Sequence, residues 1–340
     1  FFNTRMVFSF EYYYKTTKDM LLAAPMPIYM GYASNTYTNI GEANNRGIEM
    51  NLEWRDKTES GFEYNVGVNM STIRNRMTKL NGGTPISDGP FRNGSMYLTY
   101  TNEGMPIGAF WGYKTDGLIQ TQEQLNAVKR ADFQPNAELG DVLFVDTNGD
   151  GKLDSSDRCM IGNPIPDIIY GINMGMAWKG FDLNLQFGGT IGNQIFNAMR
   201  YYTYFPNDIT NKDRALMNYW TPNNTNTDIP RLTATDVNDN DRFSDMYVEN
   251  GTYFRLRNAQ LGYTLPASLT QRIKLQKVRF YVSGQNLFTI SSYSGMDPEV
   301  GQSSSLSRGI DYGIYPQNIS FTGGINAVSY THLTLPTKRI

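Results

Sequence analysis

The most explicit chemistry in this 340-residue sequence lies in the segment 146–157. Oxygen-bearing side chains occupy the first, third, fifth, ninth and twelfth positions of a twelve-residue loop, and a glycine at the sixth position permits a sharp turn. Hard Ca²⁺ takes six to eight oxygen ligands, and a loop with this spacing can supply them. We therefore predict a calcium-type loop with these ligands, the lysine contributing its backbone carbonyl: Asp146, Asn148, Asp150, Lys152, Asp154 and Asp157.

One departure from the calcium pattern lowers the affinity that we expect of this loop. Its last ligand is Asp157, where calcium loops prefer a glutamate that reaches the ion with both oxygens. A bound calcium is therefore expected to be structural, with a Kd of ~10⁻⁴ to 10⁻³ M. The alternative is a turn without metal, because Gly, Asn and Asp favour turns by themselves.

A group of aromatic residues forms the second candidate site. Aromatic faces in an outer loop can stack on the sugar rings of a glycan. The alternative is an aromatic girdle at a membrane interface, which outer-membrane barrels carry in any case. The expected substrate contacts are Tyr201, Tyr202, Tyr204 and Trp220.

Composition excludes several classes of function. Lys and Arg number 30 against 32 Asp and Glu, so no basic field attracts a nucleic acid. One cysteine and one histidine leave almost no material for a disulfide framework or for histidine-based catalysis. No nucleophile, base and orienting group can be assembled, so we expect no enzyme. No apolar stretch approaches the ~18 to 20 residues of a membrane-spanning helix.

The dominant pattern is an alternation of apolar and polar residues with period two, which is typical of strands with two different faces. It recurs in eight runs, apolar and aromatic on one face and rich in Asn, Glu, Gln, Ser and Gly on the other. Many runs extend for about nine to eleven residues, which matches membrane-spanning strands better than the ~5–6-residue strands of soluble sheets. They cover residues 6–15, 47–55, 62–71, 168–178, 181–188, 254–263, 278–283 and 319–326, with a β-bulge expected near Asn258.

Short and long connections alternate between these runs, as periplasmic turns and extracellular loops do in outer-membrane barrels. The sequence therefore predicts an all-β fold, an antiparallel transmembrane β-barrel with long extracellular loops and a periplasmic C-terminus. A soluble β-protein is the alternative, because alternation alone is compatible with both. The segment Gly108–Gln120 is expected to belong to a loop and not to the wall. The short connections are 56–61, 179–180 and 264–276, and the long ones are about 16–46, 72–166, 189–252 and 288–317.

Several motifs follow one another in a fixed order: Gly47–Leu52, Glu103–Gly117, Asp146–Pro166, Gly251–Pro266 and Ser283–Phe288. Together they resemble the C-terminal part of the SusC/RagA-type TonB-linked transporters in the outer membrane of Bacteroidetes. The resemblance covers about residues 1–328 and includes the large loop region 72–166 with the calcium-type loop 146–157. Residues 329–340 lack the barrel pattern, and we expect this tail, with His332, to be an artefact.

The resemblance implies a roughly 22-stranded barrel with an N-terminal plug, of which about eight wall strands are expected here. It also implies a SusD-like surface lipoprotein as partner, contact with outer-membrane lipids, and energy from the TonB–ExbB–ExbD system through the missing N-terminal part. The imported substrate would be an oligosaccharide or an oligopeptide. A siderophore or cobalamin receptor is a second transporter hypothesis. A self-contained eight-stranded adhesin or calcium-stabilised binding protein is a third, because eight strands also close a barrel.

Overall fold

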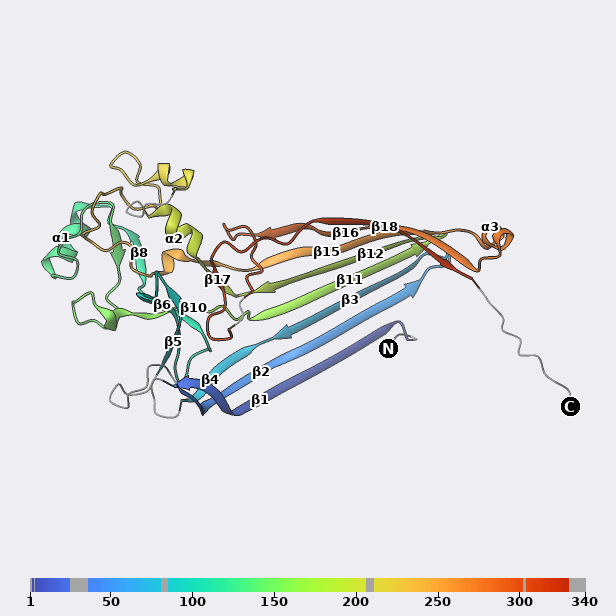
Figure 1. Cartoon of the computed structure of the whole chain (residues 1–340), viewed down its shortest axis with the longest axis horizontal. Coiled ribbons are helices and arrows are strands. Elements are labelled where there is room, and N and C mark those ends of the chain that lie inside the picture. Colours follow the sequence, from blue (N-terminus) through green and yellow to red (C-terminus); the bar gives the residue numbers. More distant parts are fainter. Residues whose placement is uncertain are drawn as a thin grey trace.

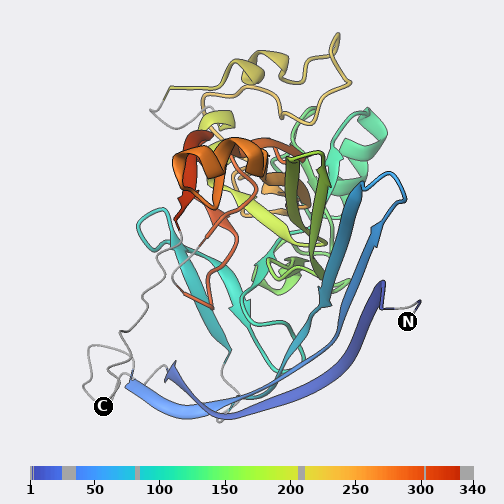
Figure 2. The ribbon, with the colours of Figure 1, turned by 90° about the vertical axis from the view of Figure 1, so that its right-hand side faces the viewer.

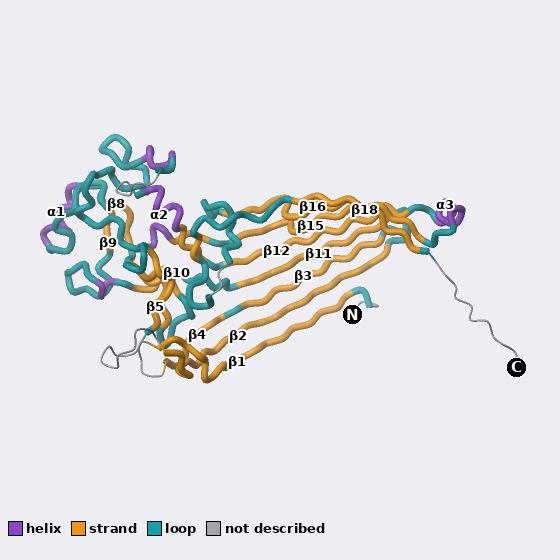
Figure 3. The backbone as a smooth tube through the Cα atoms, viewed as in Figure 1, coloured by secondary structure: helices purple, strands orange, loops and turns teal. Residues whose placement is uncertain are grey.

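An antiparallel sheet of nine strands, called the wall below, dominates the computed structural model, which describes residues 2, 4–24, 36–80, 85–205, 211–301 and 304–329. The strand order is β1-β2-β3-β11-β12-β15-β16-β18, and β4 pairs with β2 beyond the end of β3. The wall is curved, and the loops lie on its concave side (Figures 1, 2 and 3). Its strands are β1 Met6–Ala24, β2 Thr36–Lys57, β3 Glu63–Thr72, β4 Arg74–Leu80, β11 Ile168–Trp178, β12 Phe181–Ile191, β15 Tyr253–Thr264, β16 Lys277–Ser291 and β18 Ser320–Val328.

The strand register places the apolar and polar residues on opposite faces of the wall. Phe10 pairs with Met50, and Met50 pairs with Met70 on the next strand, so one apolar row crosses three strands. The adjacent row runs through Glu49 and Ser71 and is polar. Since side chains alternate along a strand, this register repeats the separation at every second residue. The prediction of an antiparallel, two-faced wall is confirmed.

Two local features that the sequence predicted are present. Lys179 and Gly180 link β11 to β12 with φ of 49° and 88°, and two successive positive φ values fit the tight type I′ hairpin turn. In β15, Leu256 and Asn258 pair with adjacent residues of β12, which leaves Arg257 as the extra residue of a β-bulge. The bulge accounts for the phase slip in the sequence pattern.

The expectation of a long loop over residues 16–46 is wrong. β1 continues to Ala24 and β2 begins at Thr36, so most of this segment is paired strand. The regular alternation ends near Thr17, where the register also shifts, but the backbone ladder continues. Beyond a membrane the outer face need not be apolar, so the hydropathy pattern disappears before the strand ends. The same applies to β4, which extends the wall into the predicted loop 72–166.

The connections at one end of the wall fold into an assembly of small sheets and short helices (Figures 1 and 3). The segment Gly108–Gln120 contributes two of its strands, β7 and β8, neither of which belongs to the wall. None of the helices in the described part of the chain is long and apolar enough to cross a membrane. The strands are β5 Ile86–Phe91, β6 Met96–Thr101, β7 Ala109–Gly112, β8 Thr115–Leu118, β9 Val142–Phe144, β10 Cys159–Gly162, β13 Gln194–Asn197, β14 Val248–Asn250 and β17 Ile310–Asp311. The helices are α1 Gln122–Arg130, α2 Ala198–Tyr204 and α3 Ala267–Thr270, of which α3 lies at the opposite end of the wall, with the 3-10 helices Ser155–Asp157, Arg214–Asn218, Asp245–Tyr247 and Gln271–Ile273.

The loop assembly is ordered because it has hydrophobic cores of its own. One core surrounds Phe110 and Phe196, which are fully buried, and gathers aromatic rings from two long connections and Ile310 from a third. A second surrounds Val142 and Phe144 in the two-stranded sheet β8–β9. Burial of each such side chain contributes about 1.5–3 kcal/mol, which long polar loops otherwise lack. The loops are therefore a packed unit that can hold side chains in fixed positions.

Candidate functional sites on the wall and in the loops

The inner, concave face of the wall is mainly polar. Its glycines lie beside larger polar residues, and an added Cβ at Gly175 would stand 2.2 Å from the Asn65 side-chain oxygen. The same holds for Gly262, where a Cβ would stand 2.4 Å from Nη2 of Arg279. Large polar side chains therefore lie flat across the glycines. The result is a hydrogen-bonding surface of low relief, which suits contact with hydrophilic solutes.

An ion pair crosses this inner face close to the short turns. Arg279 donates from Nε to Asp182 at 2.9 Å and from Nη2 to the side-chain oxygen of Gln260 at 3.0 Å. The two charged side chains are only 14% and 24% exposed. Three neighbouring strands, β12, β15 and β16, are thus joined by one side chain.

A buried network, called the loop latch below, joins the last long loop to the wall. Arg255 of β15 is 2% exposed and donates to Asp297 at 2.5 Å, to Glu299 at 2.8 Å and to the Thr289 hydroxyl at 2.8 Å. Sequence reasoning missed this network. The available signal was an arginine on a strand of otherwise apolar periodicity, together with the acidic pair that flanks a proline in Asp297–Glu299.

Asp297 is held in its ionised form within the loop latch. Burial alone would raise the pKa of this carboxyl group, but the backbone N–H groups of Gln317 and Glu299 and the Arg255 guanidinium outweigh that effect. The pKa of Asp297 therefore lies below its ordinary value. The N–H groups of Gln317 and Glu299 lie 2.9 Å and 2.8 Å from the oxygens of Asp297, so this one carboxylate binds two segments of the loop that are 18 residues apart.

The calcium-type loop is held by hydrogen bonds from its own backbone. Asp146 accepts N–H groups from Gly149 at 2.6 Å and Gly151 at 2.9 Å, and the bond from Gly151 is the main reason that its pKa is lowered. Asp157 is fully buried, where it accepts the N–H groups of Thr147 and Asp154, each at 3.0 Å. The first and last predicted ligands thus both point into the loop.

The predicted ligands are of the types that calcium prefers, but their oxygen atoms are not gathered around one point in this structure. The predicted ligands share one compact turn, which Asn148 and Asp150 close through Asn148 Nδ2, 3.0 Å from the Asp150 carboxylate. Within the described ranges, however, no group of three or more His, Cys, Asp or Glu side chains lies close enough to hold a metal ion. Asp150 and Asp154 instead accept the N–H groups of Lys152 and Ser156. Calcium binding at this loop remains a prediction.

The four aromatic candidates do not form one surface. Tyr201 is 2% exposed in the core around Phe196, and burial raises the pKa of its hydroxyl well above the ordinary value. Trp220 is 6% exposed and donates from Nε1 to Gln120 at 2.8 Å. Protein atoms cover these two rings in this structure, so neither presents a face for stacking on a substrate. Tyr202 and Tyr204 are half-buried and keep part of their surface accessible.

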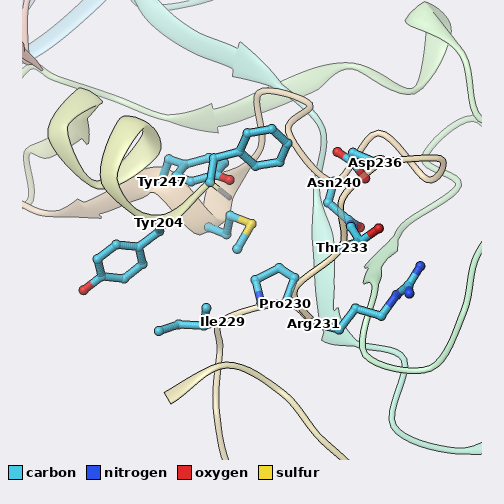
Figure 4. A pocket seen from close by; sticks show the side chains of 10 residues that line it. Tyr204, Ile229, Pro230, Arg231, Thr233, Asp236, Asn240 and Tyr247 are labelled. Carbon is cyan, nitrogen blue, oxygen red and sulfur yellow. The ribbon is translucent and has the colours of Figure 1, made fainter. Parts of the chain in front are cut away.

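Two hollows lie beside these aromatic residues. The hollow in Figure 4 lies between Tyr204, Pro230 and Tyr247 and has a volume of about 20 Å³, which accommodates about one water molecule. The second is open, has a volume of about 730 Å³ and is lined by Tyr202, Arg92 and several carboxylates. That volume lies within the ~300–1,000 Å³ of small-molecule sites. The carboxylates are those of Asp236, Asp239 and Asp241.

Comparison with known proteins identifies the wall. The family model described as "TonB dependent receptor-like, beta-barrel" matches residues 1–156. TonB-dependent receptor P3 of Formosa agariphila is 37% identical over 337 residues, which are 96% of this chain and 32% of that protein. The wall is part of a TonB-dependent receptor-like β-barrel. TonB-dependent receptor SusC of Bacteroides thetaiotaomicron is 26% identical over 327 residues, covering 96% of this chain and 30% of SusC.

A solved structure of the RagAB peptide transporter shares the fold of this receptor chain. It superimposes with a TM-score of 0.75 at 25% identity and covers 95% of this chain and 33% of its own. The chain thus spans about a third of the length of the relatives that it matches. TonB-dependent receptors are outer-membrane proteins and not enzymes, so the apolar face of the wall meets lipid and the polar face meets the lumen.

Proposed function

We propose that the protein imports hydrophilic oligomers, oligosaccharides or oligopeptides, across the outer membrane. The observation that carries this proposal is the likeness, over 95% of the chain, to the RagAB peptide transporter. The similarity to SusC and the polar inner face of the wall support it. By the same likeness, we propose a SusD-like surface lipoprotein as partner and the TonB–ExbB–ExbD system as the source of energy.

The open hollow in the loop assembly is the proposed contact site for the imported oligomer. Tyr202 offers a partly accessible ring, and Asp239 and Asp241 offer acceptors for hydroxyl or amide donors. A peptide or a sugar brings many such donors. The adhesin hypothesis loses support, because the relatives that match are about three times as long as this chain.

The calcium-type loop has a proposed structural role in the same assembly. Oxygens of Asp146, Asn148, Asp150, Asp154 and Asp157 and the Lys152 carbonyl would hold the ion. A bound calcium would offset the repulsion between the carboxylates and stiffen the loop.

Deletion of the full-length gene, with and without complementation, tests the import function. The strain is grown on single oligosaccharides or on peptides as the carbon source, and uptake of the labelled oligomer is measured. We expect loss of growth and uptake on one oligomer class, restored by the gene and reduced by the Tyr202→Ala variant. A growth defect that occurs only under iron or cobalamin limitation would contradict the proposal.

A further inference from the structure

The strands β1, β2 and β4 extend toward the loop assembly at one end of the wall (Figure 1). A group of arginines lies on the extensions of β2 and β4. Arg46 of β2 pairs with Tyr14 on one side and with Arg74 on the other, and Arg76 pairs with Asn44. These side chains line a hollow of about 550 Å³, called the arginine site below. Neither the proposed contact site for the oligomer nor the calcium-type loop includes these residues.

The arginine site lies on the outer face of the wall. The pairing of β2 with β3 ends at Glu49–Ser71 and its pairing with β4 resumes in the same register at Arg46–Arg74. Arg46 and Arg74 therefore share a face with the outward Met50. On the opposite face, Met77 belongs to a core packed against residues of the loop assembly.

The height of the arginine site corresponds to the surface of the membrane. Ile48 and Met50 belong to the apolar outer face, and Arg46 lies two residues before Ile48, or about 7 Å away along the strand. Tyr12 and Tyr14, which pair with Ile48 and Arg46, are 63% and 58% exposed and fit the aromatic girdle of a barrel. The extracellular loops lie at this end of the strands, so the site is level with the headgroups of the outer leaflet.

The arginine site carries uncompensated positive charge. Arg74 makes an ion pair with Asp167, whose side chain is 41% exposed. Arg46 and Arg76 are exposed and form no ion pair with any residue in the described ranges. Among the described residues, Asn44 donates to the Tyr14 hydroxyl at 2.7 Å and Asn75 donates to the Asn45 side chain at 2.8 Å, and all four of these groups are neutral. No carboxylate of the described residues lines the hollow.

We propose that the arginine site binds the phosphate group of a phosphorylated lipid in the outer leaflet. Guanidinium groups bind phosphate through paired, charge-assisted hydrogen bonds, and Arg46 and Arg76 are available for this. The apolar rows directly below would contact the acyl chains of the same molecule. A phosphorylated glycolipid thus matches both the charge and the height of the site. This inference rests on the outer-membrane location and not on the identity of the imported substrate.

Binding of purified lipid A to the full-length transporter in detergent tests the proposal. The double variant Arg46→Gln/Arg76→Gln removes the unpaired charges at exposed positions. We expect its Kd for diphosphorylated lipid A to rise at least about tenfold, because the variant lacks the charge-assisted hydrogen bonds of both guanidinium groups. The control Lys179→Gln removes an outward cation from the turn at the opposite membrane surface and should leave Kd unchanged. Heat-modifiable migration on gels verifies that each variant is folded.

Two further probes separate the possible sources of phosphate. Lipid A without phosphates should bind wild type as weakly as the double variant binds the phosphorylated lipid. Inorganic phosphate alone should compete only at concentrations far above that of the lipid. Equal affinity of wild type and double variant, equal affinity for both lipids, or tight binding of free phosphate would each overturn the proposal.

Discussion

Replacement of Arg255 by methionine tests whether the loop latch holds the last long loop. Methionine keeps much of the volume but leaves Asp297, which is 8% exposed, without its cation. Removal of one partner from a buried ion pair costs about 3–5 kcal/mol. Asp297 keeps two backbone N–H donors, so we take about 3 kcal/mol, which raises the opening equilibrium of the loop by about two orders of magnitude.

Hydrogen exchange followed by mass spectrometry on the full-length transporter measures this opening. Peptides that contain Glu299 and Gln317, whose amides donate to Asp297, should exchange about 100-fold faster in the variant. The matched control is Arg257→Met, because Arg257 is 43% exposed and makes a single ion pair with Glu299 at 3.2 Å. Such an exposed pair contributes about 0–1 kcal/mol, so the control should change exchange less than about fivefold.

Two outcomes would refute this reasoning. Unchanged exchange in Arg255→Met would show that the ion pair does not hold the loop. Equal acceleration in the wall peptide 168–178 would show global destabilisation in place of local opening. A second substitution, Asp297→Asn, removes the unpaired charge and should partly restore slow exchange in the Arg255→Met background.

Three further predictions concern the metal, the inner wall and pH. Calorimetric titration of calcium into the full-length protein should show binding with a Kd of ~10⁻⁴ to 10⁻³ M, and the Asp157→Asn variant should show no binding. The absence of a heat signal in wild type would mean that the loop is a turn without metal. Gly175→Ala should lower the free energy of unfolding in urea by about 1–3 kcal/mol, because its Cβ would stand 2.2 Å from Asn65. The control Gly67→Ala, whose Cβ has no neighbour closer than 4.0 Å, should leave this free energy unchanged. Equal effects of the two substitutions would count against the packing of polar side chains over glycines. Because the folded-state pKa of Asp297 is lowered, its contribution to loop closure is present above the ordinary carboxyl value of 3.8 and lost as pH falls below it. Protection of the Glu299 amide should thus be constant from about pH 7 to 5 and decrease below about pH 4, and a loss already at pH 6 would contradict the assignment.

The wall was predictable from the sequence because one of its faces meets lipid and the other meets water. Along each strand, apolar and polar residues therefore alternate with period two. Residues such as Phe10 and Met50 must meet lipid while Glu49 and Ser71 meet water, and the register preserves this row by row. The slip at Arg257 was visible for the same reason. Above the membrane this constraint ends, so the extensions of β1 and β2 leave no such pattern and were predicted as loop.

The loop sites were less predictable, because they depend on contacts between distant segments. Arg255 and Asp297 are 42 residues apart and become partners only when the last loop packs against β15. Tyr201 and Tyr202 are adjacent and chemically identical, yet one is buried in the loop core and the other is half-buried. Residue type alone does not distinguish a core ring from a ligand-contacting ring.

Spin-label accessibility along β11 tests most directly whether this wall separates lipid from an aqueous lumen. Single cysteines are introduced from Ile168 to Trp178 in the full-length transporter, with Cys159 replaced by serine, and the protein is reconstituted in lipid. Labels at Ile172, Met174 and Met176 should be accessible to oxygen in the bilayer, and labels at Asn173 and Ala177 to a water-soluble nickel complex. Period-two alternation between the two reagents is the predicted result. Equal accessibility of both faces to the nickel complex would contradict the transmembrane wall.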